Sequence, residues 1–578
     1  MFLGASSLVD FKLGALQVER IYLGANEVWN SSGGLDADAV AFAAATGATD
    51  ITFISLFFTG LKDLGFWDTS VFHMMKLDQN YPTGTAIKSA GGLGSFDAIA
   101  INGASKDAEG MIFDGINDYV EFNNPLKTTA LSNYSMFAIF KSDIGSAGQA
   151  VIGSYNGTAG LRGPQLFARQ SPMQGGTFDG TKLFQDLTVD GTTQIVFGNA
   201  GRQTINLAVT GEIQSAAAIF RGDPAATSAL WIYSNTDTTR GQSFTPPTTA
   251  WNNNDKFRIG ARIDNGYYFK GNIAFTLVSS SLIVGANYLE LLTLYKTSIG
   301  ASAAARAYVE QGFDANAAAY IAAVEAAAGM APITTIQKDT INNFIVTEKE
   351  AGRWSRLRRF YLPIWGNYEA NKICMRSLST QAITSGVTHV NNGYIETTST
   401  SGYYSIGVNF TQTGVFRDHC IGNLQANIFN NSTLWGSGAV TPSRVLETRL
   451  GGTAGVTTGR VNAWAAAYPE GTDIGNQNGI VMMNLVNDLM SASNRSSTGF
   501  TNIYADKAVP YTGGASGAPF MFLARNNSNS GTYSPAYGAT GKRAGGFFIS
   551  LSMDEANRTE FSLKWKDLWE TCTGLTLP

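Results

Sequence analysis

The chain begins with a ten-residue repeat of apolar and small residues. Leu-Gly-Ala recurs at residues 3–5, 13–15 and 23–25, and a short apolar or β-branched stretch follows each copy. Ten residues accommodate a five-residue strand and a turn, and glycine and asparagine favour turn conformations. The pattern predicts a small meander of three strands within residues 1–34, which end in the hinge-like sequence NSSGG.

This opening segment is too apolar for a disordered tail and too short to fold alone. We therefore expect it to dock on another surface, which is a partner protein, further copies of this chain, or the first helices of the chain itself. The side chains expected to anchor it are Leu13, Val18, Ile21, Tyr22, Leu23, Val28 and Trp29.

A period of 3.6 residues follows and predicts a helical hairpin within residues 35–84. Asp36 and Gly47 are suited to cap the start and the end of its first helix. In the second helix, Ile54, Phe58 and further apolar residues fall on one stripe, which predicts a face packed against a core.

From about residue 85 the hydrophobic period changes to two. In KFRIGARI (256–263), Phe257 falls on one face and Arg258 and Arg262 fall on the other. Several such segments, separated by turns rich in Asn, Gly and Asp, predict an antiparallel sandwich in which each sheet has one solvent-facing side.

The same plan then appears a second time. Residues 313–354 copy the helical hairpin, because EKEAGRW (348–354) aligns with LKDLGFW (61–67) and Asp314 matches Asp36. A second β-rich stretch follows, and it also ends in a short helix. The sequence predicts a duplication of one unit, a helical hairpin followed by a sandwich.

The expected fold class is therefore mainly β with short helical hairpins. A small N-terminal β meander precedes two repeats of helical hairpin plus antiparallel β-sandwich. The expected domains are the N-terminal β-repeat at 1–34, a helical connector at 35–84, a first sandwich at 85–300, a second helical connector at 301–366 and a second sandwich at 367–578.

Composition narrows the function. Charged residues make up 15% of the chain and the net charge is −4, so there is no basic field of the kind that binds nucleic acid. No long uncharged apolar run predicts membrane insertion, and the first residues lack the basic region of a signal peptide. The three cysteines, Cys374, Cys420 and Cys572, form no metal-binding spacing and are expected to be buried free thiols.

Catalytic motifs are missing from the sequence. His73, His389 and His419 lie in no metal-binding or triad pattern, so we expect neither an enzyme nor a cofactor. Calcium is one exception left open: Asp114, Asn117 and Asp118 carry oxygen ligands. The alternative for these three residues is a plain hairpin turn, and the sequence favours it.

Some loops combine aromatic residues with Asn, Asp and Gly, as glycan-binding loops do, because aromatic rings stack on sugars and amides bond their hydroxyls. The alternative is that one aromatic of each pair simply faces the core. The candidates for glycan contact are Trp251, Tyr267, Tyr268 and Tyr403.

Three segments resemble known protein families. VERIYLGANEVW (18–29) resembles an N-terminal segment of many bacteriophage and prophage structural proteins. MIFDGINDYVEF (111–122) and the segment 257–282 resemble strands of a laminin-G-like, concanavalin A-like jelly roll.

This resemblance implies a phage virion structural protein, such as a head or tail fibre, an adhesin or a decoration protein. Its expected partners are other virion proteins of the capsid, portal, collar or tail, two further copies of itself in a homotrimer, and glycans of the host or the environment. Such a protein is assembled into the virion in the host cytoplasm. Two alternatives stay open, a passive cement protein without a ligand and a polysaccharide depolymerase, whose pair of carboxylates leaves no readable spacing.

Overall fold

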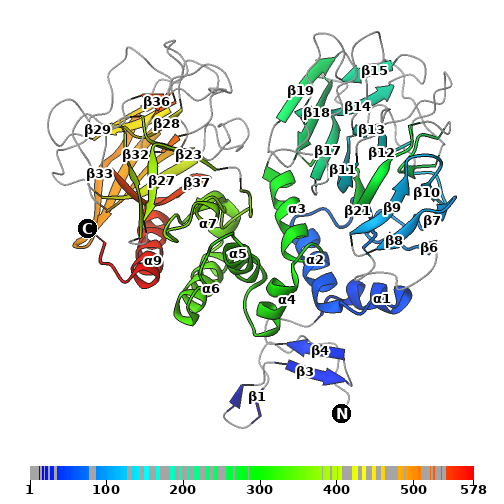
Figure 1. Ribbon diagram of the computed structural model, residues 1–578, viewed down its shortest axis with the longest axis horizontal. Helices are drawn as coiled ribbons and strands as arrows, with labels where there is room; N and C mark the ends of the chain where they lie inside the picture. Colours follow the sequence, from blue (N-terminus) through cyan, green and yellow to red (C-terminus); the bar gives the residue numbers. More distant parts are fainter. Residues whose placement is uncertain are drawn as a thin grey trace. The chain divides into compact units, whose positions relative to one another are not determined.

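A computed structural model of the chain divides into two compact units, Met1–Ile299 and Gly300–Pro578 (Figure 1). The structure describes residues 12–13, 16–17, 20–23, 26–30, 35–76, 86–107, 109–126, 133–143, 149–154, 165–168, 182–188, 194–197, 205–206, 214–221, 228–234, 239–244, 256–263, 267–283, 286–380, 382–390, 393–399, 401–405, 419–426, 433–437, 446–450, 457–461, 479–486, 489–508, 521–522, 525–526, 535–536 and 542–577.

The N-terminal segment forms two antiparallel strand pairs. β1 (Lys12–Leu13) pairs with β2 (Leu16–Gln17), and β3 (Arg20–Leu23) pairs with β4 (Asn26–Asn30). Within the described residues, the ten-residue repeat therefore forms two small hairpins, and its first copy lies outside them. Of the anchor candidates, Val18 lies outside the described residues and the others lie in these strands. That they dock on a partner stays a prediction.

Two helices then form the predicted hairpin, α1 (Ala37–Thr46) and α2 (Ile51–Asp63). The Asp36 carboxylate accepts hydrogen bonds from the backbone N–H groups of residues 38 and 39, and Gly47 ends α1 with φ +76°. Both caps agree with the sequence prediction, since a short acceptor at the start and a left-handed glycine at the end satisfy backbone groups that the helix leaves unpaired.

The first unit contains two antiparallel sheets. The strands of the first sheet run in the order β19-β18-β17-β11-β21-β9-β8, with β5 also on β21. Their bounds are β5 (Ser70–Met74), β8 (Ser105–Asp107), β9 (Gly110–Asp114), β11 (Tyr134–Ser142), β17 (Gln214–Arg221), β18 (Ser228–Ser234), β19 (Thr239–Phe244) and β21 (Lys270–Ser279). β5 lies in a segment expected to be a connector, so the sandwich includes residues before 85.

The second sheet of this unit has the order β15-β14-β13-β12-β20-β10-β7-β6, with β16 on β14. Its strands are β6 (Ala86–Ile87), β7 (Ala98–Ile101), β10 (Tyr119–Phe122), β12 (Gln149–Gly153), β13 (Gln165–Ala168), β14 (Lys182–Thr188), β15 (Gln194–Phe197), β16 (Ile205–Asn206) and β20 (Arg258–Ile259).

The central strands of the first sheet, β11 and β21, are buried on both faces. One face packs on the second sheet through residues such as Met136 and Ile273. The other face packs, through residues such as Phe137 and Phe275, against α1, α2 and α3 (Ala286–Thr297). The expectation of one solvent-facing side per sheet is therefore wrong for this sheet, because the helical hairpin covers the side that would otherwise meet water.

The second unit repeats this plan. The helices among its described residues are α4 (Ala303–Glu310), α5 (Ala315–Glu325), α6 (Thr335–Glu350), η1 (Trp354–Arg356), α7 (Tyr368–Asn371) and α9 (Glu555–Thr573). Its first sheet has the order β33-β32-β31-β27-β37-β25-β24, with β22 on β37, which matches the first sheet of the first unit strand for strand.

The strands of that sheet are β22 (Leu357–Tyr361), β24 (Val387–Val390), β25 (Tyr394–Thr397), β27 (His419–Ala426), β31 (Gly479–Val486), β32 (Leu489–Ser496), β33 (Gly499–Ala508) and β37 (Arg543–Ser550). The other sheet contains β23 (Ile383–Ser385), β26 (Tyr403–Ser405), β28 (Thr433–Ser437), β29 (Leu446–Leu450), β30 (Thr457–Val461), β34 (Met521–Phe522), β35 (Arg525–Asn526) and β36 (Pro535–Ala536).

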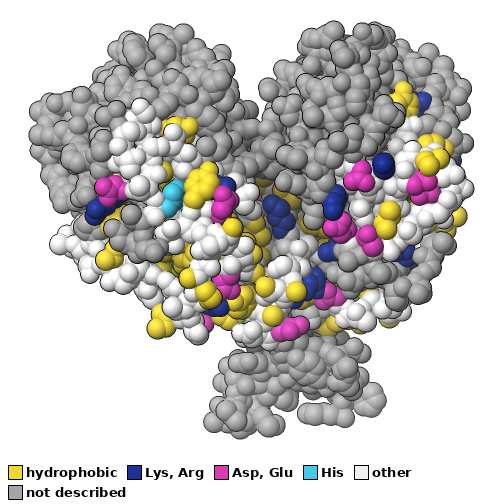
Figure 2. All heavy atoms as spheres, in the orientation of Figure 1, with side chains coloured by type: hydrophobic (Ala, Val, Ile, Leu, Met, Phe, Trp, Pro, Cys, Tyr) yellow, Lys and Arg dark blue, Asp and Glu magenta, His cyan; other side chains and the backbone are white. Residues whose placement is uncertain are grey.

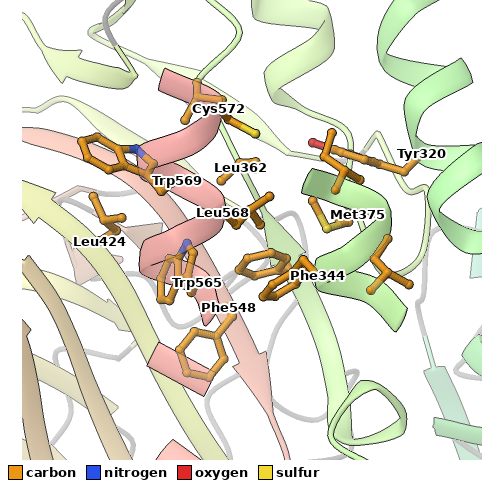
Figure 3. Packing of buried hydrophobic residues seen from close by; sticks show 14 of the residues in the cluster. Tyr320, Phe344, Leu362, Met375, Leu424, Phe548, Trp565, Leu568, Trp569 and Cys572 are labelled. Atoms are coloured by element: carbon orange, nitrogen blue, oxygen red, sulfur yellow. The ribbon is translucent and has the colours of Figure 1, made fainter. Parts of the chain in front are cut away.

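Even an irregularity is shared between the units. The pairing of β11 with β21 skips Ala274, and the pairing of β27 with β37 skips Gly545 at the matching place. In the second unit the next residue is Gly546, and Trp565 of α9 packs against it: a Cβ built there would lie 2.6 Å from the indole Cζ2. Figure 3 shows Trp565 and Trp569 among the buried apolar residues that form the core of the second unit.

The structure thus bears out the mainly β fold class with jelly-roll sandwiches and short helices. Among the described residues, no helix has the length and apolar character needed to cross a membrane.

Candidate functional site

Two neighbouring strands of the second sheet in the first unit bring charged and aromatic side chains together. β10 and β20 pair so that Val120 lies opposite Ile259 and Glu121 lies opposite Arg258. Val120 and Ile259 point into the core between the sheets. Because side chains alternate along a strand, Tyr119, Glu121 and Arg258 are on the face directed away from that core.

Arg258 is at the centre of this group. Its Nε donates to Glu121 Oε2 at 2.8 Å, and its Nη1 donates to the backbone oxygens of Arg262 at 3.1 Å and Ile263 at 2.9 Å. Its guanidinium carbon lies 4.2 Å from the centre of the Tyr119 ring, which is a cation–π contact. These contacts hold Arg258 in one position.

A second arginine and tyrosine lie beside the first pair. The guanidinium carbon of Arg262 is 4.4 Å from the centre of the Tyr267 ring. Tyr267 has a backbone φ of +59°, a left-handed conformation that is unfavourable for a bulky side chain. Its carbonyl accepts a hydrogen bond from Ala150 N at 2.8 Å, which helps to keep the segment in this conformation. We call Tyr119, Glu121, Arg258, Arg262 and Tyr267 the tyrosine–arginine cluster.

The two arginines correct one sequence expectation. They were expected on a solvent-facing side, but Arg258 is only 9% exposed and Arg262 only 7%. A buried guanidinium needs partners to offset the loss of its hydration. The carboxylate, the carbonyls and the tyrosine rings supply these partners, while Lys256 Nζ lies 3.5 Å from Glu121 Oε1 at an exposed edge.

The second unit shows that the fold does not require this cluster. In its corresponding strands, β26 and β34, Tyr404 lies opposite Phe522 and Ser405 lies opposite Met521. The positions of Glu121 and Arg258 are therefore taken by Ser405 and Met521. The same strand pairing forms in the second unit without an ion pair like that of Glu121 and Arg258. The tyrosine–arginine cluster is therefore a feature of the first unit and is not needed for the strands to pair.

The structure places the four residues that were expected to contact glycans in different surroundings. Tyr267 lies in the cluster, and its neighbour Tyr268 is half-buried. Tyr403 is in the other unit at the position of Tyr119, and at 8% exposure its ring lacks a free face for a sugar. Trp251 lies outside the described residues.

Sequence reasoning missed Tyr119, Glu121, Arg258 and Arg262 as members of one site. The alternation in 256–263 did place Arg258 on the face away from the core, as the structure has it. Nothing in the sequence, however, pairs this segment with β10, which lies more than a hundred residues earlier. Pairing of β20 with β10 is what assembles the cluster.

Other candidate chemistry finds little support. Among the residues that the structure describes, no group of three His, Cys, Asp or Glu side chains is placed to hold a metal ion. The three cysteines are buried and free, as expected, and burial raises the pKa of the Cys420 and Cys572 thiols to about 12. Such thiols carry almost no thiolate at neutral pH and are poor nucleophiles.

The cluster offers the chemistry of a binding site. Its half-buried tyrosine rings supply apolar faces with a hydroxyl at the edge, and Glu121 supplies acceptors, while the two buried arginines hold these side chains in place. On the face of the molecule shown in Figure 2, acidic and basic side chains of the described residues are interspersed. A polyhydroxylated ligand, which needs donors, acceptors and an apolar face at once, suits the side chains of the cluster.

Comparisons with known proteins find distant structural matches and no match by sequence. No protein-family model matches the chain, and no curated protein matches it either. Among solved structures, the CBM40 of the Ruminococcus gnavus IT-sialidase, bound to α2,3-sialyllactose, is 15% identical over 27% of this chain and 78% of its own, with a TM-score of 0.20.

Two further solved structures match the chain at comparably low identity. Domain 4 of AbnA, a GH43 extracellular arabinanase from Geobacillus stearothermophilus in complex with arabinotriose, is 13% identical over 38% of this chain and 87% of its own, with a TM-score of 0.20. The Trypanosoma rangeli sialidase in complex with sialic acid is 11% identical over 82% of this chain and 67% of its own, with a TM-score of 0.28.

Proposed function

We propose that this chain is a structural protein of a bacteriophage virion, attached to the particle by its N-terminal strands and binding glycans through its first jelly roll. The observation that carries the binding role is the tyrosine–arginine cluster. Five side chains from three segments converge there, and the sister unit builds the same strands without the central ion pair.

The strained backbone of Tyr267 supports a role in binding. Left-handed φ values in bulky residues cost about 1–3 kcal/mol and persist where the surroundings enforce them, which is common at ligand sites. Here the strain presents the ring to the Arg262 guanidinium.

The attachment role rests on the opening segment. Its sequence resembles the N-terminal segment of phage structural proteins, and its four short strands form only two small hairpins. Isolated hairpins are marginal in water, so a surface that completes them would stabilise them. Other proteins of the particle are the proposed surface.

The glycan role is tested by binding of the purified chain to a glycan array. Tyr119→Leu should reduce binding at least tenfold, because it removes the ring that packs on Arg258. The matched control is Tyr403→Leu, since Tyr403 holds the same position in the second unit, and it should bind as the unchanged chain does. Equal binding by both variants, or no binding of the unchanged chain to any glycan, would contradict the glycan role.

The attachment role needs a separate test. A chain that starts at residue 35 should fold and keep its glycan binding but fail to join particles when it is supplied during infection. Incorporation at the normal level would refute an N-terminal anchor. A chain that stays on particles while binding no glycan would instead support a passive cement protein.

A further inference from the structure

An exposed isoleucine lies beside the tyrosine–arginine cluster, on the strand next to β10. β7 pairs with β10 so that Ile99 lies opposite Glu121 and Ile101 lies opposite Tyr119. Ala98, which precedes Ile99 in β7, packs in the core between the two sheets. Because side chains alternate along a strand, Ile99 is on the outer face together with Glu121. Ile99 is 42% exposed, so an apolar side chain meets water next to the carboxylate.

The pairing keeps one register across the neighbouring strands. Ala86 of β6 lies opposite Ile99, Ile99 lies opposite Glu121, and Glu121 lies opposite Arg258. Directly opposed residues on one face have Cβ atoms about 4.5–5.5 Å apart. The row therefore passes from an apolar half, in which both side chains are exposed, to a polar half formed by the ion pair. Single exposed apolar residues are common on proteins, but this one lies in contact range of a fixed carboxylate.

Glu121 has one oxygen that can serve a ligand. Its Oε2 accepts the hydrogen bond from Arg258 Nε at 2.8 Å, which fixes the orientation of the carboxylate. Its Oε1 lies 3.5 Å from Lys256 Nζ, which is longer than an ordinary N–H···O hydrogen bond. The side chain of Glu121 is 21% exposed, so a ligand on the outer face can reach it. An ionised carboxylate only accepts, so the ligand group that binds Oε1 must be a donor.

The two halves of the row suit one chemical group, the acetamide of an N-acetylated sugar. A secondary amide is planar and trans, so its N–H and its methyl group project from the same edge while its carbonyl oxygen points away. The N–H can donate to the carboxylate while the methyl group covers the isoleucine beside it. A hydroxyl in the same place donates but leaves the isoleucine in contact with water, and an ammonium adds charge without any apolar surface.

We propose that the glycan bound at the tyrosine–arginine cluster carries an N-acetyl group, whose N–H donates to Glu121 Oε1 and whose methyl group packs on Ile99. This inference rests on the proposed glycan role and adds the class of ligand, N-acetylated amino sugars. Hydrogen bonds to a charged acceptor are stronger than those between neutral groups, and contact between the methyl group and Ile99 removes apolar surface of both from water.

The test compares sugars that differ only in the group on carbon 2. An array presents N-acetylglucosamine, glucosamine and glucose, together with the corresponding three sugars of the galactose series. In at least one series, the full chain should bind the acetamido sugar about tenfold more tightly than either of the others. Coulombic attraction to Glu121 alone would favour the ammonium of the free amino sugar, so this comparison separates the two explanations. Saturation-transfer NMR should show the strongest transfer to the acetyl methyl protons.

A matched pair of variants tests the role of Ile99. Ile99→Thr keeps a β-branched side chain and removes its apolar end, so it should reduce the preference for the acetamido sugar about fivefold and leave binding of the hydroxyl sugar unchanged. The control is Ile112→Thr, because Ile112 is 36% exposed on β9, in the other sheet of the same unit. It should keep the full preference. Thermal unfolding of both variants checks that each is folded.

The outcomes distinguish this inference from the glycan role itself. Equal binding of the acetamido and hydroxyl sugars, tighter binding of the ammonium sugar, or a full preference in Ile99→Thr would each overturn the N-acetyl inference. Binding of any glycan in a manner that depends on Tyr119 would leave the glycan role standing in those cases. If the chain binds no glycan on the array, the glycan role is contradicted, and the N-acetyl inference is overturned with it.

Discussion

Lys349 at the end of α6 lies across the hairpin from Asp314 at the start of α5, with Nζ 2.7 Å from Oδ2. The first unit has the same contact between Lys62 and Asp36, at 2.6 Å. Each aspartate caps the first helix of its hairpin, and each lysine is followed three residues later by a glycine with φ near +70°. The two hairpins are therefore closed by the same contact; the sequence alignment matched their caps and glycines but did not predict the ion pair.

The two partners of this contact should differ in their effect on stability. Asp314→Ala removes both the helix cap and the ion pair, so we expect it to lower the free energy of unfolding by about 1–2 kcal/mol. Lys349→Met removes only a half-exposed ion pair and should lower it by less than about 1 kcal/mol. Denaturant unfolding of the full chain, followed by tryptophan fluorescence, measures both. Equal losses would mean that Asp314 contributes nothing as a cap.

The buried ion pair of Glu348 and Arg353, at the end of α6, is replaced by two apolar residues in the first unit. Arg353 donates to both carboxylate oxygens of Glu348, at 2.7 and 2.9 Å, and both side chains are almost fully buried. The aligned residues are Leu61 and Phe66, which are also buried. Glu348→Leu alone leaves a buried charge with only Glu560 as a carboxylate partner and should cost about 3–5 kcal/mol.

The paired change should restore what the single change loses. With Glu348→Leu and Arg353→Phe together, no buried charge is left alone, and we expect stability near or above that of the unchanged chain. The same unfolding measurement provides a double-mutant comparison. A double variant as unstable as Glu348→Leu would show that the apolar solution of the first unit does not fit the second.

His73 should make the first unit sensitive to acid. Burial lowers the pKa of His73 to about 4, and its ring nitrogen lies 2.9 Å from the Phe96 oxygen. In the unfolded chain the ordinary value is near 6.5. Stability is therefore fully present above pH 6.5 and falls by about 1.4 kcal/mol per pH unit down to pH 4, because the unfolded state binds the proton first.

This pH dependence can be checked by unfolding the chain between pH 7 and pH 4. His73→Gln does not titrate, so its stability should fall less steeply over that range, whatever its value at pH 7. Identical slopes for the variant and the unchanged chain would assign the acid sensitivity to other groups.

Tyr267 should matter more for binding than for stability. Asparagine tolerates a left-handed backbone better than tyrosine, but Tyr267→Asn also removes the ring that packs on the buried Arg262, so the two effects should offset and change the free energy of unfolding by less than about 1 kcal/mol. The same variant loses the ring that packs on Arg262 and should bind glycans several-fold more weakly. Thermal unfolding and glycan-array binding of one protein sample measure the two effects. A variant that loses stability and keeps binding would remove Tyr267 from the site.

The sequence predicted the elements well and their partners poorly. Caps at Asp36, Gly47 and Asp314 are local features, in which the responsible side chain lies within a few residues of the backbone it satisfies. The duplication was also readable, because a repeated motif needs no knowledge of contacts. The strand order, the burial of β11 and β21 on both faces and the neighbourhood of Arg258 depend on pairing between distant segments, which periodicity does not encode.

The candidate site illustrates this limit. The mixture of aromatic and amide residues drew attention to Tyr267, but the same reasoning selected Tyr403, whose ring is buried. Asp118 shows the reverse case. Its oxygen ligands were visible in the sequence, but only the structure shows that one of its oxygens is buried without a donor among the described residues.

Two sandwiches with the same strand order in one polypeptide risk exchanging parts while they fold. The position after the shared bulge guards against this: it is Phe275 in the first unit and Gly546 in the second. If α9 packed on the sheet of the first unit, Trp565 would clash with Phe275. If α3 packed on the sheet of the second unit, a cavity would remain above Gly546. The difference between Phe275 and Gly546 thus disfavours the packing of either C-terminal helix on the sheet of the other unit.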